Sequence, residues 1–424
     1  MKIFVDSVGC RLNQSEIEKF ATQFRAAGHI LVDAAVEADI VLINTCTVTV
    51  EAASDSRQKI RQANRAGKAD IAVTGCLSTL EADLAAALPW VKWIIPNVHK
   101  KDLVPEVLNL PIEEIDLEPF ARQLLPGIHK RTRAFIKTQD GCDNHCTFCI
   151  TRIARGAVRS QSIEEVLTDI HLALVGGAKE IVLTGVHLGS WWQDFNPRLQ
   201  LKDLVNSILL KSQPQRLRLS SLEPWDLSSD FFSLWQNERM CRHLHLPLQS
   251  GCGATLRRMA RKVTPESFAG LVETARRVSP GMAITTDVIV GFPGETDAEF
   301  GESLDFVAQM VFAGGHVFRY SARPGTPAAR YHNQVPSKVY KERSAAMRAV
   351  LAESARTFRQ HFIEQRIEVL WEGAGSFGPQ GWQMEGLTDN YLRVEAWSPV
   401  NRWNEVNLVE LKEDRGNRIS GVII

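Results

Sequence analysis

Three cysteines within one short segment carry the strongest chemical signal in this sequence. Cys142, Cys146 and Cys149 form the pattern CxxxCxxC, directly after a strand-like stretch over residues 134–139. Thiolate is the usual protein ligand of iron–sulfur clusters, and no fourth cysteine lies nearby. Three thiolates therefore predict a cluster in which one iron stays open for another ligand. The alternatives are a zinc knuckle and unrelated buried thiols, although zinc prefers four ligands and His145 lies too close to its neighbours to complete a tetrahedron easily.

A second group of three cysteines is dispersed in the sequence but shares one topological position. Cys10, Cys46 and Cys76 each follow a strand-like segment, and helix patterns separate these segments. This alternation predicts a parallel, flavodoxin-like sheet, in which the carboxyl ends of the strands share one edge. We expect the three thiols to meet there and to hold a second cluster, although any one of them alone would suit a core thiol. The strand patterns cover residues 2–8, 39–44 and 71–74, and the helix patterns cover 13–27 and 51–66.

The middle of the chain predicts an incomplete barrel. Six β/α units make about three quarters of a (β/α)8 barrel, and its active site belongs at the carboxyl ends of the strands, where the Cys142 loop lies. A partial (β/α)6 barrel also leaves a lateral opening, which suits a macromolecular substrate. The strand patterns are 135–139, 180–185, 216–221, 243–249, 283–291 and 316–321, and the helix patterns are 163–175, 201–211, 228–237, 265–278 and 298–310.

The whole chain is predicted to be an α/β protein of several domains. Residues 1–110 form the N-terminal domain with its auxiliary cluster, and 111–132 form a proline-containing linker. Residues 133–335 form the barrel core, and 336–365 read as one long helix. Residues 366–424 contain five short strand patterns, which predict a small all-β barrel of OB-like type.

Composition places the chain among ordinary globular proteins. It has 424 residues, of which 44% are hydrophobic and 23% are charged. Its formal net charge is zero, so the overall charge does not indicate that the chain binds nucleic acid. Eight cysteines are too few for a disulfide scaffold in a chain of this length, which favours a reducing compartment. No apolar run suits a signal peptide or a membrane span. We therefore expect a cytoplasmic protein that makes no membrane contact.

The motifs taken together resemble the radical S-adenosylmethionine (SAM) methylthiotransferase family, over nearly the whole chain. In that family a three-cysteine domain precedes the radical SAM core and a small TRAM domain follows it. Asn-Thr-Cys-Thr-Val-Thr at 44–49 resembles the bacterial MtaB type, whereas Thr151-Arg152 departs from the Ile-Pro often found there. The blocks that carry the resemblance are GCRLNQ at 9–14, NTCTVT at 44–49, TGC at 74–76, CDNHCTFC at 142–149, LPLQSG at 246–251, DVIVGFPGET at 287–296 and YSARPGT at 320–326.

The resemblance implies a reaction and its cofactors. The MtaB type adds a methylthio group to N6-threonylcarbamoyladenosine beside the tRNA anticodon, and its relatives act on isopentenyladenosine or on a ribosomal protein. The family uses SAM and two 4Fe–4S clusters, one held by Cys142, Cys146 and Cys149 and the other by Cys10, Cys46 and Cys76. The first cluster cleaves SAM to a radical that removes hydrogen from C2 of the adenine, and the second carries the sulfur.

The resemblance also suggests contacts to SAM along the barrel strands. Ser221 and Gln249 end strand patterns at the predicted active face, and Asp287 and Ile289 belong to a block expected near the adenine. A glycine-rich element before the second strand is expected near the amino group of SAM, although a glycine helix stop explains it equally well. Its residues are Gly176, Gly177 and Glu180.

Local charge predicts where RNA binds. Residues 120–160 contain eight Lys or Arg against two Asp or Glu, beside the Cys142 loop, and phosphate contacts dominate RNA affinity. A shorter basic run covers residues 257–262. Arg323 is a candidate for a substrate carboxylate, with an ion pair or helix cap as the alternative. The expected RNA contacts are Arg131, Arg133, Arg152, Arg155 and Arg159.

The expected partners are the anticodon stem-loop of tRNA and a reductant protein such as flavodoxin or ferredoxin, and the chain is expected to act as a monomer. Two other function classes stay open. An electron carrier with two clusters would not need SAM cleavage, and a zinc-stabilised RNA-binding protein would contain no iron. Neither class explains six barrel units with motifs at the strand ends.

Overall fold

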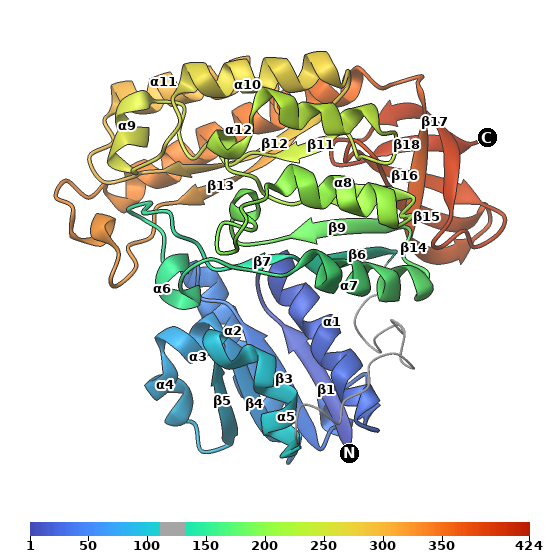
Figure 1. The fold of residues 1–424 in the computed structure, drawn as a ribbon. Helices are drawn as coiled ribbons and strands as arrows, with labels where there is room; N and C mark the ends of the chain where they lie inside the picture. The colour runs from blue at the N-terminus through green and yellow to red at the C-terminus, as the bar shows by residue number, and fades with distance from the viewer. Residues whose placement is uncertain (111–131) are drawn as a thin grey trace.

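The computed structural model describes residues 1–110 and 132–424 of the chain (Figure 1). The expected linker at 111–132 therefore lies outside the described residues except for Thr132, and so does Arg131. Among the described helices, none is both long enough and apolar enough to cross a bilayer.

The N-terminal part is a parallel sheet in the order β2-β1-β3-β4-β5, which is the flavodoxin-like order predicted from the sequence. Its two faces bury alternate residues of each strand. Leu42 packs with Phe20 and Phe24 of α1, whereas Ile43 packs with Ile60 of α2. The strands are β1 (Lys2–Ser7), β2 (Ile30–Leu31), β3 (Ile40–Thr45), β4 (Asp70–Gly75) and β5 (Val91–Pro96). The helices are α1 (Arg11–Ala26), η1 (Ala35–Glu37), α2 (Val50–Ala66), α3 (Cys76–Leu80), α4 (Ala82–Ala86), η2 (Asn97–Asp102) and α5 (Leu103–Leu108).

Six parallel strands form the predicted partial barrel. They make two sheets, β6-β9-β10 and β11-β12-β13, which isolated bridges such as Ser221 to His245 join. Within the described residues β6 and β13 do not pair, so the barrel is open along one side. The strands are β6 (Arg133–Lys137), β9 (Glu180–Thr184), β10 (Arg216–Leu219), β11 (His243–His245), β12 (Ala283–Val290) and β13 (Gly314–Arg319), with a short hairpin of β7 (Gln139–Asp140) and β8 (Arg159–Ser160).

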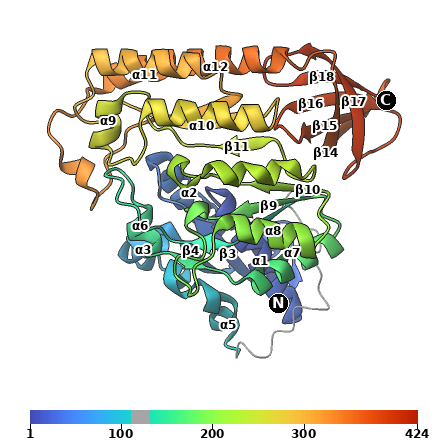
Figure 2. The ribbon, with the colours of Figure 1, turned by 45° about the horizontal axis from the view of Figure 1, so that its top comes forward.

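Helices cover the outside of these strands (Figures 1 and 2). Local signals set their bounds, because Ser162 with Glu165 and Thr296 with Glu299 form capping boxes at the first turns of α7 and α11. The helix predicted at 228–237 is instead a 3₁₀ helix, η7. The elements are α6 (Thr151–Arg155), α7 (Ile163–Val175), η5 (Leu188–Ser190), α8 (Leu201–Lys211), η6 (Pro224–Asp226), η7 (Ser229–Gln236), α9 (Gly253–Arg258), α10 (Pro265–Val278), α11 (Asp297–Gln309) and η8 (Pro327–Arg330).

A long helix, α12 (Ser337–Gln360), leads to a closed barrel of five strands, as predicted. This small barrel docks at the amino end of the core strands (Figure 1). Arg216 on β10 donates 2.9 Å hydrogen bonds to the carbonyls of Leu387 and Glu368. The order is β14-β15-β16-β18-β17, with β14 (Arg366–Gly378), β15 (Gly381–Thr388), β16 (Arg393–Ser398), β17 (Val406–Asp414) and β18 (Ile419–Ile423).

A buried ion pair anchors this docking. Arg218 is fully buried, lies 2.6 Å from Glu180, and donates to the carbonyls of Thr388 and Asp389. Breaking a buried pair from one side leaves an uncompensated charge, so we expect Arg218→Met to lower the free energy of unfolding by about 3–5 kcal/mol. Urea unfolding and limited proteolysis of the C-terminal barrel measure this effect.

Arg242→Met is the control. Arg242 pairs with Asp389 from a position about one third exposed, so this substitution should lower the free energy of unfolding by about 1 kcal/mol or less. Equal losses in the two variants would contradict the role of burial.

Candidate active site

The three dispersed cysteines meet at the carboxyl edge of the N-terminal sheet. Cys10 follows β1, Cys46 follows β3, and Cys76 is the first residue of α3 directly after β4. These strands are neighbours in register, so their ends lie side by side. Gly9 makes the close approach possible, because it has a φ of +101° and a Cβ there would lie 2.5 Å from the Cβ of Cys46. The turn after β1 therefore brings Cys10 to the edge that the other two thiols share.

The chemistry of these thiols suits iron. All three are free thiols, and burial together with Cys76 and Cys10 raises the pKa of Cys46 to about 12. Such a thiol stays protonated at neutral pH unless a metal displaces its proton. No group of three His, Cys, Asp or Glu within residues 1–110 and 132–424 is placed to hold one metal ion. In a 4Fe–4S cluster each thiolate binds a different iron, so the sulfur atoms lie further apart than the ligands of one ion. The lack of a site for a single ion among the described residues therefore does not test the cluster.

Two asparagine side chains lie close to the sulfur atoms of these cysteines. The Oδ1 atom of Asn13 lies 3.9 Å from Sγ of Cys10, and its Nδ2 donates to the carbonyls of Val8 and Thr45 at 2.7 and 3.0 Å. Nδ2 of Asn97 lies 3.9 Å from Sγ of Cys76. Nδ2 of Asn97 can donate a hydrogen bond to a cluster sulfur, and such bonds orient the ligands and tune the metal. Oδ1 of Asn13 can only accept, so it suits the protonated thiol of Cys10 and not its thiolate.

The Cys142 loop lies between β7 and β8 and is held by backbone contacts. The N–H of Cys142 donates to the carbonyl of Gly156 at 3.1 Å, and the N–H of Cys149 donates to the carbonyl of Cys146 at 3.1 Å. The N–H of Asn144 points to Sγ of Cys142 at 3.4 Å. Backbone donors aimed at sulfur are typical of thiolate ligands to iron. These backbone contacts fix the conformation of the loop and leave Cys142 in a setting that suits a thiolate ligand.

An arginine and a glutamate that sequence reasoning did not single out for this site support the loop. Nη1 of Arg261 lies 3.8 Å from Sγ of Cys146, and Arg261 forms a forked pair with Glu223 at 2.7 and 3.1 Å. Burial raises the pKa of Cys146 to about 11, and Arg261 opposes that rise. Arg261 belongs to the basic run at 257–262, which indicated RNA, but the side chain is buried against the cysteine loop.

His187 is a second group that the sequence did not reveal. It lies just beyond the carboxyl end of β9, with Nε2 2.6 Å from Oδ2 of Asp226 and Nδ1 3.3 Å from Nδ2 of Asn144. Burial alone would lower its pKa, but Asp226 and the sulfur of Cys142 raise the pKa to about 10. His187 therefore lies directly beside the cysteine loop, with its Nε2 atom held by Asp226.

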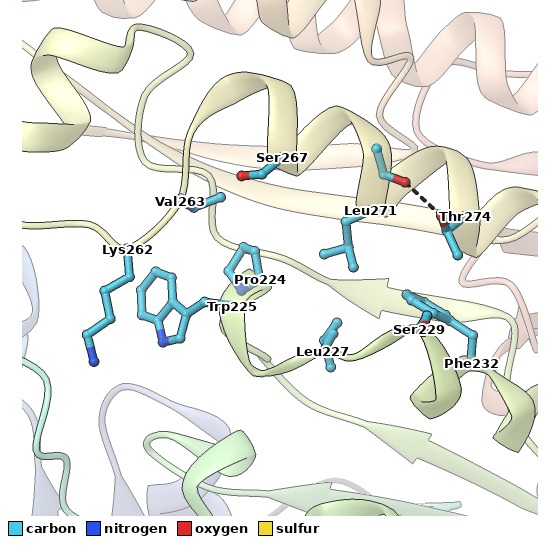
Figure 3. A pocket seen from close by; sticks show the side chains of 11 residues that line it. Pro224, Trp225, Leu227, Ser229, Phe232, Lys262, Val263, Ser267, Leu271 and Thr274 are labelled. Carbon is cyan, nitrogen blue, oxygen red and sulfur yellow. Dashed lines mark hydrogen bonds between the residues drawn. The ribbon is translucent and has the colours of Figure 1, made fainter.

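A cavity of about 350 Å³ opens on the outer side of the barrel, between η6, η7 and α10 (Figure 3). Trp225 and Lys262 lie at one end of it, and Phe232 and Thr274 lie at the other. The ring of Trp225 also contacts the guanidinium of Arg261 at 4.4 Å. This cavity is separate from the strand ends, and Arg261 connects its wall to Cys146.

The glycine-rich element lies at the wrong end of the barrel for SAM. Gly176 ends α7, and the carbonyl of Gly177 accepts a hydrogen bond from Asn404 of the C-terminal barrel at 2.8 Å. Glu180 begins β9 and is fully buried against Arg218. Because Gly176 and Gly177 precede β9 and Glu180 is its first residue, all three lie at its amino end, opposite the Cys142 loop. The expectation of SAM contacts does not fit this position, and the helix-stop alternative does.

The remaining candidates for SAM lie at the active face. Gln249 has a φ of +70° and bridges to β12 through backbone bonds with Asp287 and Ile289, each 2.8 Å long. Its Oε1 atom and Oδ1 of Asp287 are buried without a hydrogen-bond partner in the part of the chain that the structure describes. Oxygens without a partner at the active face could accept hydrogen bonds from a ligand, although the other carboxylate oxygen of Asp287 already lies 3.2 Å from His245. Ile289 packs with Phe148 of the cysteine loop, and Ser221 pairs with His245 at the end of β10.

The arginines expected to bind RNA divide by burial. Arg152 and Arg159 are exposed, although Arg159 lies 3.7 Å from Asp140. Arg133 pairs with Glu372 of the C-terminal barrel, and Arg155 is 2% exposed inside an ionic network. Buried guanidinium groups held by carboxylates do not fit phosphate contacts, so the expectation is revised for these two. Arg323 donates to the carbonyl of Thr47, beside Cys46.

Comparison with known proteins agrees with this geometry. Residues 2–95 match the uncharacterized protein family UPF0004, and residues 136–307 match the radical SAM superfamily. The chain is 36% identical over 399 residues to the threonylcarbamoyladenosine tRNA methylthiotransferase MtaB of Bacillus subtilis, covering 92% of this chain and 88% of that protein. It is 33% identical over 405 residues to a tRNA-2-methylthio-N(6)-dimethylallyladenosine synthase of Acidothermus cellulolyticus, covering 92% and 81%.

A solved structure shares the fold as well. The radical SAM methyltransferase TsrM of Kitasatospora setae superposes with a TM-score of 0.57 at 14% identity, over 77% of this chain and 76% of that one. The identity to the methylthiotransferase of Bacillus subtilis covers 92% of this chain, and the radical SAM match covers the cysteine loop and the strands β9 to β12, so the enzyme uses SAM and a 4Fe–4S cluster. This chain therefore belongs to the radical SAM methylthiotransferase family.

Proposed function

We propose that this enzyme converts N6-threonylcarbamoyladenosine beside the anticodon of tRNA into its 2-methylthio derivative, with SAM and two 4Fe–4S clusters. One observation supports the proposal most directly. Helix α3 begins at Cys76 and packs against α6, which begins two residues after Cys149. Asn97 spans this junction, with Nδ2 2.7 Å from the carbonyl of Ala154 and 3.9 Å from Sγ of Cys76. A radical generator and a sulfur donor must act on the same carbon, and the two thiol groups lie on either side of one helix contact.

The residues have distinct parts in this chemistry. When bound, the cofactors supply a radical that removes hydrogen from an unactivated carbon and a sulfur that replaces it. Cys142, Cys146 and Cys149 hold the core cluster. The unpartnered oxygens of Gln249 and Asp287 provide acceptors for polar groups of SAM. Packing of Ile289 against Phe148 keeps water from the loop, which protects a reactive radical.

The substrate assignment rests on the relatives and on Arg323. Three relatives named for threonylcarbamoyladenosine are 34–36% identical to this chain, and two named for dimethylallyladenosine are 30% and 33% identical. Arg323 lies beside the Cys46 loop through its bond to Thr47, where a guanidinium can pair with the threonyl carboxylate. Exposed Arg152 and Arg159 provide phosphate contacts. We further propose a cytoplasmic monomer reduced by a flavodoxin or ferredoxin.

Mass spectrometry of tRNA nucleosides tests the substrate. A strain that lacks the gene should lose 2-methylthio-N6-threonylcarbamoyladenosine, and the complemented strain should regain it. Other 2-methylthio nucleosides should stay unchanged in both strains, which provides the internal control. Loss of only the methylthio derivative of isopentenyladenosine would leave the chemistry intact and overturn the substrate assignment. Unchanged tRNA together with a loss of methylthio groups from ribosomal protein would overturn the assignment to tRNA.

A further inference from the structure

A buried ionic network lies between the N-terminal sheet and the Cys142 loop. Glu16 of α1 is its centre, with Nζ of Lys100 at 2.6 Å, Nζ of Lys137 at 2.9 Å and Nη1 of Arg155 at 3.2 Å. Asp140 completes it, 2.7 Å from Lys137 and 3.0 Å from Arg155. The network joins residues that are far apart in the sequence, and every member comes from an element next to one of the two thiol groups.

The charges within this network do not balance. Three cations face two carboxylates, and Arg159 at the rim adds a further positive charge 3.7 Å from Asp140. Burial opposes ionisation of Glu16, yet Lys100, Lys137 and Arg155 hold its pKa well below its usual range. The side chains of Glu16, Lys100, Asp140 and Arg155 are at most 5% exposed, whereas that of Lys137 is 24% exposed, so water screens Lys137 in part but screens Arg155 very little. A buried net charge is costly unless an opposite charge lies nearby.

A cluster held by Cys10, Cys46 and Cys76 would supply that opposite charge. Nη2 of Arg155 donates to Oδ1 of Asn13 at 2.7 Å, and that same oxygen lies 3.9 Å from Sγ of Cys10. Arg155 also interacts electrostatically with Cys76 and Cys46. A 4Fe–4S core held by three thiolates has a net negative charge, which grows when the cluster is reduced. The positive excess of the network is complementary to that charge.

We propose that Arg155 is a positioning residue that supplies compensating positive charge to the cluster held by Cys10, Cys46 and Cys76. The inference rests on the second cluster of the proposed function and adds an electrostatic role for a residue that binds no metal. Reduction adds negative charge, so a nearby cation favours the reduced cluster. Removing the cation should shift the midpoint potential to more negative values, and removing an anion from the same network should shift it the other way.

Potentiometric titration followed by electron paramagnetic resonance tests these signs. The full-length chain with Cys142, Cys146 and Cys149 changed to alanine isolates the signal of the remaining cluster. In that background Arg155→Met should shift the potential to more negative values, and Glu16→Gln should shift it to more positive values. Arg155→Lys keeps the positive charge, so its midpoint potential should stay close to that of the background protein. Arg65→Met is the control, because Arg65 is exposed in the last turn of α2 and takes no part in the network, and it should leave the potential unchanged.

Opposite shifts separate charge from packing, because a loosened structure would move the potential in the same direction in both variants. Shifts of equal sign, or no shift in either variant, overturn the role of Arg155. If Arg155→Met fails to retain iron, the Arg155→Lys and Glu16→Gln variants still decide the question. If the background protein itself binds no cluster, the proposed second cluster fails and this inference fails with it.

Discussion

Changing Cys142, Cys146 and Cys149 together to alanine is expected to leave the protein with about one cluster's worth of iron and no SAM cleavage. In the proposed function the open iron of the core cluster binds SAM, and the thiolates of these three cysteines are the protein ligands of that cluster. Without them the reduced protein should form no 5′-deoxyadenosine above the detection limit of the assay. Iron and acid-labile sulfide analysis gives the cluster content, and chromatography of the SAM products gives the cleavage.

The control for this variant is Cys252→Ala, which removes a buried thiol that lies outside both groups. It should retain the iron content of the unchanged enzyme and its rate of SAM cleavage. Full SAM cleavage by the triple variant would show that the core assignment is wrong. Zinc in place of iron in the unchanged protein would instead revive the alternative of a zinc-stabilised RNA-binding protein.

Changing Cys10, Cys46 and Cys76 together to alanine should separate the two halves of the reaction. These thiols lie at the edge of the N-terminal sheet, whereas the SAM candidates lie on the barrel strands. The variant should therefore still convert SAM to 5′-deoxyadenosine with a chemical reductant, but it should form no methylthiolated nucleoside. Anaerobic turnover with tRNA, followed by mass spectrometry of its nucleosides, measures both products in one sample.

The risk in this variant is structural, since two of the three residues are buried at strand ends. A circular dichroism melt shows whether the variant is folded, and its SAM cleavage reports on the barrel independently. A folded variant that still installs methylthio groups would overturn the second cluster. A folded variant that loses SAM cleavage as well would show that the two sites do not act separately.

Local signals explain why so much of the architecture could be predicted from the sequence. Capping boxes and a regular apolar period set the bounds of α7 and α11 to within a residue. Alternating strand and helix patterns were sufficient to predict the flavodoxin-like sheet and therefore the meeting of Cys10, Cys46 and Cys76. The prediction failed at 228–237, where the apolar period did not distinguish an α-helix from the 3₁₀ helix η7.

The tertiary structure decided which charged side chains reach the site and which do not. A basic segment looks the same whether its arginines face solvent or a buried carboxylate, and Arg155 meets Glu16, which precedes it by 139 residues. The prediction that Glu180 contacts SAM was wrong for a related reason, because only residues at the carboxyl end of β9 face the active site. Arg261 and His187 reach the cysteine loop only because distant barrel strands end at the same face. Residue types and spacing determined the chemistry of this enzyme, because thiolate ligands are recognisable locally. The charges around those thiolates were decided by the fold, because electrostatic partners are set by distance in space.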